Sequence, residues 1–357
     1  MPESPSIPVL VLGGSGYVAG ELLRLLAHHP VFRVAAVASA THAGVSVADA
    51  FPHLAGSYPE EMRFEDPARM RERVRAAGPL GVFAATPHGT TAALLDDLLA
   101  AAEKAGAGIR AVDLSADFRF RDPARYAAVY GRAHAAPHRL ASFCCAVPEH
   151  HPGAPAAHAA QPGCFTTAVV LAAFPVYACG LAEGGFFAAA VTGSSGSGRT
   201  PAQNTHHPER SGNCYAYAPL AHRHEAEMRL LLAPACGGVE PDVEFVPHSG
   251  PFVRGIHATL RFTLRCAAPA EEIAAAVASF YAASPFVEVS TAPPKLGAVV
   301  GTNRCRLGVA VRGRTLVLLA AIDNLVKGAA GGGVQWMNRL FGLAEETGLR
   351  LPGLGWH

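Results

Sequence analysis

A glycine-rich turn near the start of the chain constrains the fold more than any other feature. An apolar run, Val9–Leu12, leads into Gly13-Gly14-Ser15-Gly16-Tyr17-Val18-Ala19, and an apolar helical pattern then continues to about His28. Residues 14–19 fit the Gly-x-Gly-x-x-Gly/Ala fingerprint, in which glycines let the backbone approach a pyrophosphate at a helix N-terminus. Its position between a strand and a helix predicts a dinucleotide-binding site. The alternative is an ordinary glycine turn of an α/β sheet.

The pattern of predicted elements changes near residue 164. Before it, short apolar runs alternate with helical patterns, which predicts an α/β fold with a parallel sheet and crossover helices. Strands are expected there at 9–12, 34–37, 80–85 and 109–114, and helices at 17–28 and 90–104. Later strands are expected at 186–192, 243–247, 256–264, 306–311 and 315–321, with a helix at 270–283. Alternating apolar and polar residues in 256–264 indicate one buried sheet face, so a mostly antiparallel second domain is predicted.

The segment after the second predicted strand bears on the choice of nucleotide. It reads Val37-Ala38-Ser39-Ala40-Thr41-His42, with no acidic residue before Asp49. NAD-binding domains usually place an acid here to bind the ribose hydroxyls, and such an acid would repel a 2′-phosphate. Ser39 and Thr41 can donate hydrogen bonds to a phosphate instead. The sequence therefore favours NADP(H) over NAD.

Cys164 follows Gln161-Pro162-Gly163, where a turn leads into a long uncharged segment with a helical pattern. A thiol at a helix N-terminus faces unpaired backbone N–H groups and the positive end of the helix dipole, which favour the thiolate. We therefore predict a nucleophilic cysteine; the alternative is a buried cysteine that acts as a small hydrophobe. The uncharged stretch 164–182 contains Pro175 and Gly180, which favour a buried helix ending near Ala173 over a membrane span.

Composition narrows the class of partner. The chain has 357 residues, enough for two domains, and its 29 basic and 28 acidic residues give a formal charge of +1. No chain-wide basic field is available for nucleic acid or an anionic membrane, so a small-molecule partner is expected. The eight cysteines form no regular disulfide framework, and no signal-like segment precedes Gly13. We expect reduced thiols and a cytoplasmic location.

Further motifs run along almost the whole chain. They are Glu21-Leu22-Leu23-Arg24, Pro87-His88-Gly89, Asp113-Leu114-Ser115-Ala116-Asp117-Phe118-Arg119, Val147-Pro148-Glu149, Pro162-Gly163-Cys164, Ser194-Ser195-Gly196-Ser197-Gly198-Arg199, His222-Arg223-His224-Glu225-Ala226-Glu227, Val253-Arg254-Gly255, Gly301-Thr302-Asn303 and Ile322-Asp323-Asn324-Leu325-Val326-Lys327-Gly328. With these motifs, the glycine-rich turn and Cys164, the chain resembles the N-acetyl-γ-glutamyl-phosphate reductase family of arginine biosynthesis, which is similar in fold and chemistry to aspartate-semialdehyde dehydrogenase. Two positions depart from the usual family pattern: Gln161 replaces a common Asn, and Ala19-Gly20 reverses a frequent Gly-Ala order.

The resemblance implies a domain organisation and a cofactor site. A Rossmann-type NADP-binding domain would comprise residues 1–163 plus 324–357. An inserted α+β domain, similar to the C-terminal domain of glyceraldehyde-3-phosphate dehydrogenase, would comprise residues 164–323 and serve catalysis and oligomerisation. The segment 323–327 would return to the cofactor, although it also fits an ordinary strand-to-helix cap. The implied cofactor residues are Gly13, Ser15, Gly16, Tyr17, Val18, Ser39, Pro87, Gly196, Asn324 and Lys327.

The expected reaction is a reduction through a covalent intermediate. Cys164 displaces phosphate from an acyl phosphate to form a thioester, NADPH delivers a hydride, and the hemithioacetal collapses to an aldehyde. Histidine suits the proton transfers near neutral pH. By resemblance, His222 or His224 pairs with Cys164, and we favour His224; the alternative is a surface or metal-binding pair. No metal site is expected, because no nearby carboxylate or thiol spacing completes one.

Arginine and glutamate side chains are candidates for holding the substrate. Arginine binds carboxylate or phosphate in a bidentate manner, and the substrate-binding candidates are Arg119, Arg199 and Arg254, with Arg223 as a further one. Glu149 and Glu227 would orient the histidine or the substrate amide. For each of these residues the alternative is a solvated surface charge or a helix cap.

Two other functions stay open at this stage. His206-His207-Pro208-Glu209-Arg210 is similar to the relatives that reduce α-aminoadipyl or glutamyl phosphate attached to an acidic amino-group carrier protein, for which Arg210, Arg223 and Arg229 could form a basic rim. A non-catalytic NADP-binding sensor on the same fold is the alternative of another class, and it would lack the nucleophile or the base. The resemblance also suggests a homo-oligomer, a dimer or a tetramer.

Overall fold

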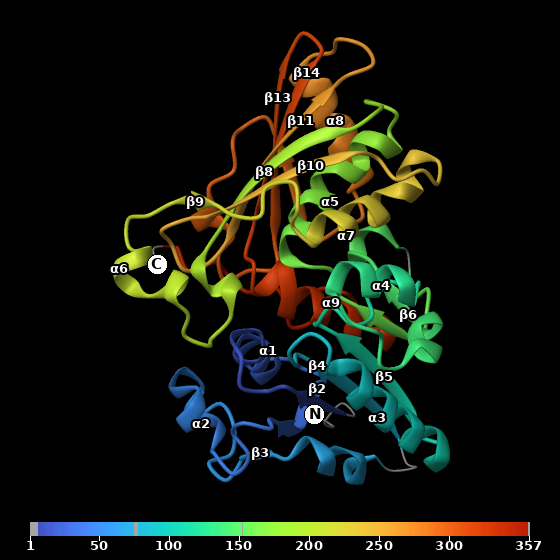
Figure 1. Ribbon diagram of the computed structural model, residues 1–357, viewed down its shortest axis with the longest axis vertical. Helices are drawn as coiled ribbons and strands as arrows, with labels where there is room; N and C mark the ends of the chain where they lie inside the picture. Colours follow the sequence, from blue (N-terminus) through green and yellow to red (C-terminus); the bar gives the residue numbers. More distant parts are fainter. Residues whose placement is uncertain (1–5, 75–77, 152, 356–357) are drawn as a thin grey trace. The chain divides into compact units, whose positions relative to one another are not determined.

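The computed structural model describes residues 6–74, 78–151 and 153–355, and it divides into two compact units (Figure 1). The first unit contains the described residues up to Gln161 together with Ala330–Arg350. The second contains Pro162–Ala329 and the described residues from Leu351 onward. Each unit is built around one seven-stranded sheet, so each has a hydrophobic core of its own.

The sheet of the first unit is parallel throughout, in the order β3-β2-β1-β4-β5-β7-β6. Its strands are β1 (Ile7–Leu12), β2 (Phe32–Ala38), β3 (Phe64–Glu65), β4 (Pro79–Ala84), β5 (Gly108–Asp113), β6 (Phe143–Cys145) and β7 (His158–Ala160). Its helices are α1 (Tyr17–Ala27), α2 (Val47–Ala50), α3 (Thr91–Ala105), α4 (Pro123–Tyr130) and α9 (Gly331–Leu340). The connections change direction between β1 and β4, and doubly wound sheets bind ligands beyond the carboxyl ends of the strands at that point.

The turn after β1 requires glycine at two positions, for two different reasons. Gly13 has φ +76°, and a Cβ on it would also collide with the backbone at residues 85–86. A Cβ on Gly14 would overlap the side chains of Val37 and Phe64. The turn therefore lies tightly against the ends of β2 and β4, and α1 starts directly beyond it.

The sheet of the second unit is mixed, in the order β12-β13-β14-β11-β8-β10-β9. Its strands are β8 (Phe186–Thr192), β9 (Tyr215–Ala216), β10 (Val243–Ser249), β11 (Ile256–Thr263), β12 (Val287–Ser290), β13 (Cys305–Arg312) and β14 (Thr315–Ile322). β12 pairs with β13 and β8 with β10 in parallel, and the other four neighbouring pairs are antiparallel, so the predicted mostly antiparallel sheet is confirmed.

Helices cover one side of the second sheet. They are α5 (Cys164–Ala178), α7 (His224–Leu232) and α8 (Ala270–Phe280), and the short α6 (His207–Arg210) lies apart from them (Figure 1). α5 packs against β11 and β14, and α7 packs against α5 and β10. None of the helices in the described ranges is long and apolar enough to cross a membrane.

Helix α5 continues past its predicted end near Ala173 and reaches Ala178, with Pro175 inside its last turns. Proline has no N–H to donate to the carbonyl four residues earlier, which here belongs to Leu171. The hydroxyl of Tyr281 donates to that carbonyl oxygen at 2.7 Å. The prediction was wrong because the replacement donor comes from a segment more than a hundred residues away in the sequence.

The chain returns to the first unit later than residue 324, where the sequence placed the domain boundary. A π-helical turn, Val326–Ala330, follows β14, and its Gly328 lies so close to the Cβ of Cys164 that no side chain would fit between them. This turn therefore packs inside the second unit. The first unit ends at Gln161, resumes at Ala330 and ends again at Arg350, whereas the expected first domain comprises residues 1–163 plus 324–357. The final segment stays with the second unit, where the Leu354 N–H donates to Val300 O at 3.3 Å.

Helix α9 completes the first unit by packing on β5 and β7. Its first turn contains three consecutive glycines, and a Cβ on Gly332 or Gly333 would run into Gln161 or Leu114, respectively. The missing side chains therefore let the helix lie close to the sheet.

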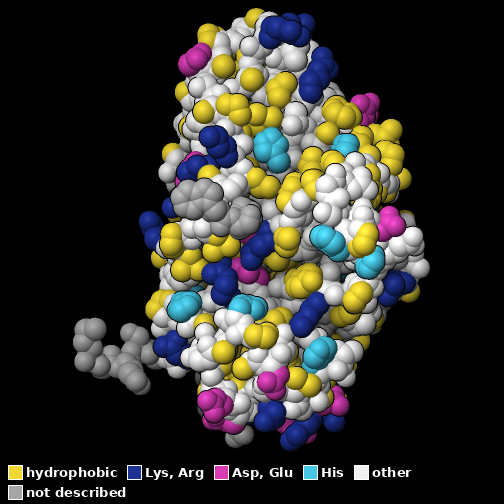
Figure 2. Space-filling view, turned by 90° about the vertical axis from the view of Figure 1, so that its left-hand side faces the viewer, with side chains coloured by type: hydrophobic (Ala, Val, Ile, Leu, Met, Phe, Trp, Pro, Cys, Tyr) yellow, Lys and Arg dark blue, Asp and Glu magenta, His cyan; other side chains and the backbone are white. Residues whose placement is uncertain are grey.

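Charged side chains are dispersed over the surface in view in Figure 2. Lys and Arg occur there in small groups among acidic, apolar and histidine side chains, rather than in one broad basic region. This distribution agrees with the balanced charge of the sequence, +1 overall.

Candidate functional site

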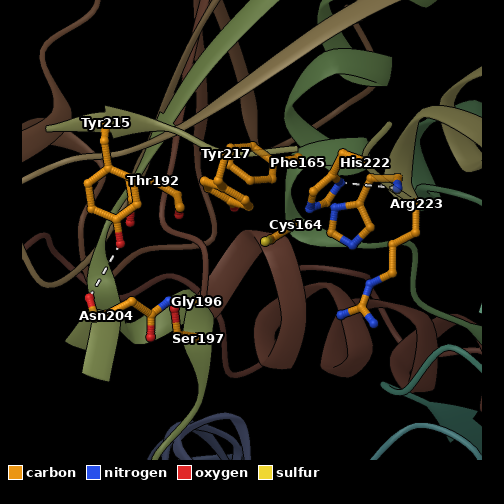
Figure 3. A pocket seen from close by; sticks show the side chains of 12 residues that line it. Cys164, Phe165, Thr192, Gly196, Ser197, Asn204, Tyr215, Tyr217, His222 and Arg223 are labelled. Carbon is orange, nitrogen blue, oxygen red and sulfur yellow. Dashed lines mark hydrogen bonds between the residues drawn. The ribbon is translucent and has the colours of Figure 1, made fainter. Parts of the chain in front are cut away.

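One cavity of the second unit, with a volume of about 250 Å³, holds the predicted nucleophile and both predicted histidines. Figure 3 shows the sulfur of Cys164 with His222 and Arg223 on one side, and Tyr215 and Asn204 on the other. The cavity is lined by Cys164, Phe165, Thr192, Gly196, Ser197, Asn204, Tyr215, Tyr217, His222, Arg223, His224 and Ser249.

Cys164 is the first residue of α5, with Gly163 as the N-cap. No side chain caps this helix start. The unpaired N–H groups and the helix dipole at such a position stabilise negative charge, and the thiol is partly accessible from the cavity. These are the conditions under which a cysteine acts as a nucleophile.

A buried carboxylate fixes the start of α5. Glu227 of α7 is 1% exposed, and its Oε2 accepts hydrogen bonds from the Gly163 N–H at 2.9 Å and from the Thr166 hydroxyl at 3.0 Å. Hydrogen bonds to an ionised acceptor are stronger than those between neutral groups. Glu227 therefore ties α7 to the turn that presents Cys164.

The two histidines stand at the start of α7 and have different surroundings. The ring of His224 lies against Gly163, where any Cβ would overlap its Nε2 and Cε1 atoms. The ring centres of His222 and His224 are 4.6 Å apart, and the backbone N–H of His224 donates to Nδ1 of His222 at 3.2 Å. Because Nδ1 accepts this bond, the proton of neutral His222 is on Nε2.

Burial controls the protonation of His222. The rings of Phe165, Tyr217 and Phe245 surround it with centres 5.7, 5.7 and 5.8 Å away. This burial, together with the positive charge of Arg223, lowers the pKa of His222 to about 4. Burial also raises the pKa of Tyr217, with nearby Cys164 adding to the effect. At neutral pH the cavity thus contains a neutral imidazole and a protonated phenol.

The start of α1 in the first unit offers open space for an anion. Gly16 is the N-cap, no side chain caps the helix, and a Cβ built on Gly16 would meet no atom within 4 Å. Backbone N–H groups at such a helix start bind phosphate. Tyr17, which is 42% exposed, and Val18 follow in the first turn, and Pro87 stands exposed beyond β4. The residues present fit the pyrophosphate of a dinucleotide.

A chain of hydroxyl groups extends from this turn to the end of β2. Ser15 Oγ lies 3.0 Å from Ser39 Oγ, which lies 3.4 Å from Thr41 Oγ1, and Thr41 bonds Nδ1 of His42 at 2.9 Å. These groups can rotate to donate to a phosphate, and none of them carries negative charge. They fit a nucleotide with a 2′-phosphate better than one with two free ribose hydroxyls.

Three predicted cofactor residues lie in the second unit. Gly196 lines the cavity. Asn324 is 2% exposed; its Oδ1 accepts the Gly255 N–H at 2.7 Å, and its Nδ2 donates to Ser195 Oγ at 3.1 Å. Asn324 therefore holds the loop that carries Gly196. Lys327 is fully buried, with Nζ 5.6 Å from the centre of the Phe286 ring.

The predicted substrate-binding residues are divided between the two units. Arg119 and Glu149 belong to the first unit, where Arg119 donates to Gln161 O at 3.0 Å and Glu149 accepts from Gln335 at 2.9 Å. Arg199 is exposed in the second unit, outside the cavity lining. Arg254 forms an ion pair with the buried Asp323 at 2.9 Å.

The basic rim predicted for a carrier protein needs correction. Arg210 is 7% exposed, so its guanidinium is not on the surface. Arg229 lies 3.9 Å from Glu240 and 4.0 Å from Asp242, and only Arg223 is both exposed and beside the cavity. The sequence prediction failed because proximity along the chain does not say which side chains point inward.

Several cavity residues were not singled out from the sequence, among them Tyr217 and Ser249. Tyr215-Ala216-Tyr217 alternates like a strand before the two histidines, and Ser249 ends β10, two residues beyond the strand expected at 243–247. An edge strand that leads into a catalytic motif was the available signal for the tyrosines. Ser249 gave no signal, because serine is common where strands end.

Comparison with known proteins gives matches along both units. The family model described as semialdehyde dehydrogenase, NAD binding domain, matches residues 8–152, and the model described as semialdehyde dehydrogenase, dimerisation domain, matches residues 164–324. N-acetyl-gamma-glutamyl-phosphate reductase of Ectopseudomonas mendocina (strain ymp) is 42% identical over 96% of this chain and 98% of its own length. The protein of the same name from Alkalilimnicola ehrlichii is 41% identical over 98% of this chain and 99% of its own length.

Solved structures share the fold at low sequence identity. Aspartate semialdehyde dehydrogenase II from Vibrio cholerae, complexed with ASA, has a TM-score of 0.68 at 17% identity and covers 95% of this chain and 99% of its own. Aspartate semialdehyde dehydrogenase with NADP from Candida albicans has a TM-score of 0.62 at 15% identity, over 94% and 99%. The predicted fold class, a Rossmann-type α/β domain with an inserted α+β domain, is confirmed.

Proposed function

We propose that this chain, which belongs to the N-acetyl-gamma-glutamyl-phosphate reductase family, reduces N-acetyl-L-glutamyl 5-phosphate to N-acetyl-L-glutamate 5-semialdehyde and phosphate with NADPH, a step of arginine biosynthesis. Membership rests on more than 40% identity over nearly the full length of both chains. The observation that carries the proposal is the single cavity in which Cys164 and two imidazoles meet.

Cys164 acts as the nucleophile. Its thiolate attacks the acyl carbon, a carbon–sulfur bond forms, and the carbon–oxygen bond to phosphate breaks, with its electron pair leaving on the phosphate oxygen. The helix start at Gly163 stabilises the thiolate that attacks. The product of this step is a thioester on Cys164.

His224 is the proton carrier of the site. His222 is unsuited to this role because its pKa is near 4 and its Nδ1 is occupied by the His224 N–H, so at neutral pH it can only donate from Nε2. The ring of His224 lies beside the start of α5. It accepts the thiol proton before the attack and returns it to the departing phosphate.

Residues of the first unit would hold the phosphates of the nucleotide. The open N–H groups at Gly16 would bind the pyrophosphate, and Ser39 and Thr41 would bind the 2′-phosphate. Bound NADPH supplies the hydride that reduces the thioester. In the second unit, Asn324 holds the loop that carries Gly196, a cofactor residue implied by the resemblance. Collapse of the hemithioacetal on Cys164 then breaks the carbon–sulfur bond, releases the aldehyde and restores the thiolate.

We extend the proposal to assembly and compartment. The side of the second sheet away from α5, α7 and α8 leaves Phe187 40% exposed and the outward residues of β11 accessible. Such a sheet face suits pairing with a second copy of the chain, which size measurement by light scattering would test. None of the eight cysteines forms a disulfide in the described structure, which agrees with the reducing cytoplasm.

The test is phosphate-dependent reduction of NADP by the purified protein with N-acetylglutamate semialdehyde, compared with Cys164→Ala and Cys164→Ser. The variants should lose about 10⁴-fold or more of the rate, because no other thiol can form the thioester. Dependence on phosphate distinguishes acyl-phosphate formation from simple aldehyde oxidation. Inactivity of the parent protein would overturn the choice of the free acetylated substrate, and full activity of Cys164→Ala would overturn the choice of nucleophile.

A further inference from the structure

A buried arginine next to the cavity has no acidic partner among the residues that the structure describes. Arg210 ends the short helix α6 and is 7% exposed. Its guanidinium donates to Ser249 Oγ at 2.6 Å and to the carbonyl of Gly250, its Nε has no hydrogen-bond partner, and the Tyr215 ring centre lies 5.9 Å away. Within the described ranges, Arg210 forms no ion pair. A buried cation among neutral groups is unfavourable until an anion comes near it.

The bond from Arg210 determines how Ser249 can act. Arginine has no acceptor atom, so Ser249 Oγ must accept in this bond, and its own hydrogen then points elsewhere. Among the described residues, no acceptor takes that hydrogen. Ser249 lines the cavity that contains Cys164, and the arginine charge makes its hydroxyl a stronger donor.

This donor stands at the end of the cavity away from the histidines. Ser249 pairs with Tyr215 across the ladder between β10 and β9. Figure 3 shows Tyr215 on the opposite side of Cys164 from His222. An anion bound at Ser249 would thus be separated from the reacting carbon at Cys164 by part of the substrate.

We propose that Ser249, oriented and polarised by Arg210, binds the α-carboxylate of the substrate. The identity of that substrate rests on the function proposed above. Its carboxylate is four carbon–carbon bonds from the acyl carbon, whereas its phosphate is attached to the acyl carbon and must lie beside the thiol. The distant donor therefore fits the carboxylate. Ser249 contacts the substrate, and Arg210 is a positioning residue that acts through it.

The experiment compares two aldehydes that differ only in this group. N-acetylglutamate semialdehyde carries the α-carboxylate, and 4-acetamidobutanal lacks it. For the parent protein, kcat/KM should favour the first aldehyde by about 100-fold, and in Ser249→Ala and Arg210→Met this preference should fall to about tenfold or less. The loss should be in KM for the aldehyde, with KM for phosphate unchanged. Arg210→Lys keeps the charge and should retain part of the preference.

The outcomes separate this inference from its alternatives. An increase in KM for phosphate alone would mean that the pair binds phosphate, and equal losses with both aldehydes would mean a structural role; either result overturns the proposal. A retained preference in both variants overturns it as well.

A binding measurement keeps the inference separate from the proposed reaction. Protection of Cys164 against iodoacetamide by N-acetyl-L-glutamine, compared with 4-acetamidobutyramide, requires no turnover. The parent should be protected at about tenfold lower concentrations of the carboxylate compound, and Ser249→Ala should show no such difference. If the parent turns over neither aldehyde, the proposed function fails, and this protection experiment still decides whether Ser249 recognises a carboxylate.

Discussion

The two units each present a helix start with a glycine N-cap and no capping side chain, and they use it differently. α1 follows Gly16, and the space that a Cβ would occupy there is open. α5 follows Gly163, and the same space is filled by the ring of His224. Both glycines have negative φ, −84° and −58°, so neither is required by backbone conformation.

The start of α1 leaves its N–H groups open to a ligand, whereas the start of α5 is surrounded by side chains of the protein itself. At α1 the N–H groups can bind an anion from solution. At α5 the Gly163 N–H donates to Glu227, and the first side chain of the helix is the Cys164 thiol. In the function proposed above, the same local structure would bind an anion in one unit and present a nucleophile in the other. Substitutions at the two starts should accordingly have separable effects.

Apart from loss of Cys164 itself, the largest expected effect is that of His224→Gln, which removes the proton carrier at the second helix start. We expect kcat to fall by about 10²- to 10⁴-fold, because the thiol must then lose its proton to water. The rate at which iodoacetamide alkylates Cys164 at neutral pH should fall as well. NADP binding, measured by fluorescence titration, should be unchanged.

His222→Gln is the matched control for this prediction. Its kcat should fall by about tenfold or less, since neutral His222 only orients its neighbours. A larger loss in His222→Gln than in His224→Gln would reverse the roles assigned to the two histidines.

Gly163→Ala should have the next largest effect, because its methyl group would displace the ring of His224. A displacement of about 1 Å in a catalytic group costs about 10²-fold in rate. We expect this loss in kcat, with an unchanged dissociation constant for NADP. Activity close to that of the parent would show that the contact between Gly163 and His224 is not needed for catalysis.

Gly16→Ala should weaken NADP binding and leave kcat unchanged, the reverse of the effect expected for Gly163→Ala. Its methyl group meets no protein atom within 4 Å, so the free energy of unfolding should change by less than about 1 kcal/mol. The same methyl would stand where the pyrophosphate binds, and KM for NADP should rise by about tenfold with kcat retained. The rate of Cys164 alkylation, measured by stopped flow, should be unchanged. A change in this rate would show that the two helix starts do not act independently.

The sequence was sufficient to predict both helix starts, because each is local. The fingerprint between a strand and a helix predicted the turn at Gly13–Ala19, and the break before an uncharged segment placed Cys164 at the start of α5. Apolar runs and alternating patterns likewise predicted the longer strands of both sheets, but not the short strands β3, β6, β7, β9 and β12. In such cases, the deciding contacts are within a few residues of each other.

Features that depend on distant partners could not be predicted in this way. Tyr281 supplies the hydrogen bond that lets α5 continue past Pro175. Arg210, expected on a surface rim, is buried against Ser249, and Arg254, expected to bind substrate, is paired with Asp323. Which charge turns inward is decided by tertiary packing, and a single sequence carries no direct signal of it.

The smallest expected effect is on the pH dependence of the free energy of unfolding, and it concerns one histidine from each unit. His158 in the first unit and His222 in the second both accept a backbone N–H on Nδ1 at 3.2 Å, and burial lowers the pKa of each to about 4. The unfolded chain, with histidine pKa near 6.5, binds more protons than the native state between pH 6.5 and 4. Each histidine therefore contributes stability that is complete above pH 6.5, falls as the pH drops to 4, and changes no further below it.

Replacement of either residue by asparagine, whose Oδ1 can accept the same N–H, should reduce the loss of stability between pH 7 and 4.5 by about 1 kcal/mol, after allowance for screening by water. Urea unfolding at the two pH values would measure it. Only His222→Asn should also alter the rate of Cys164 alkylation, because only His222 lies in the cavity with the thiol. An equal change in the alkylation rate in His158→Asn would contradict the prediction that only His222 affects the reactivity of Cys164.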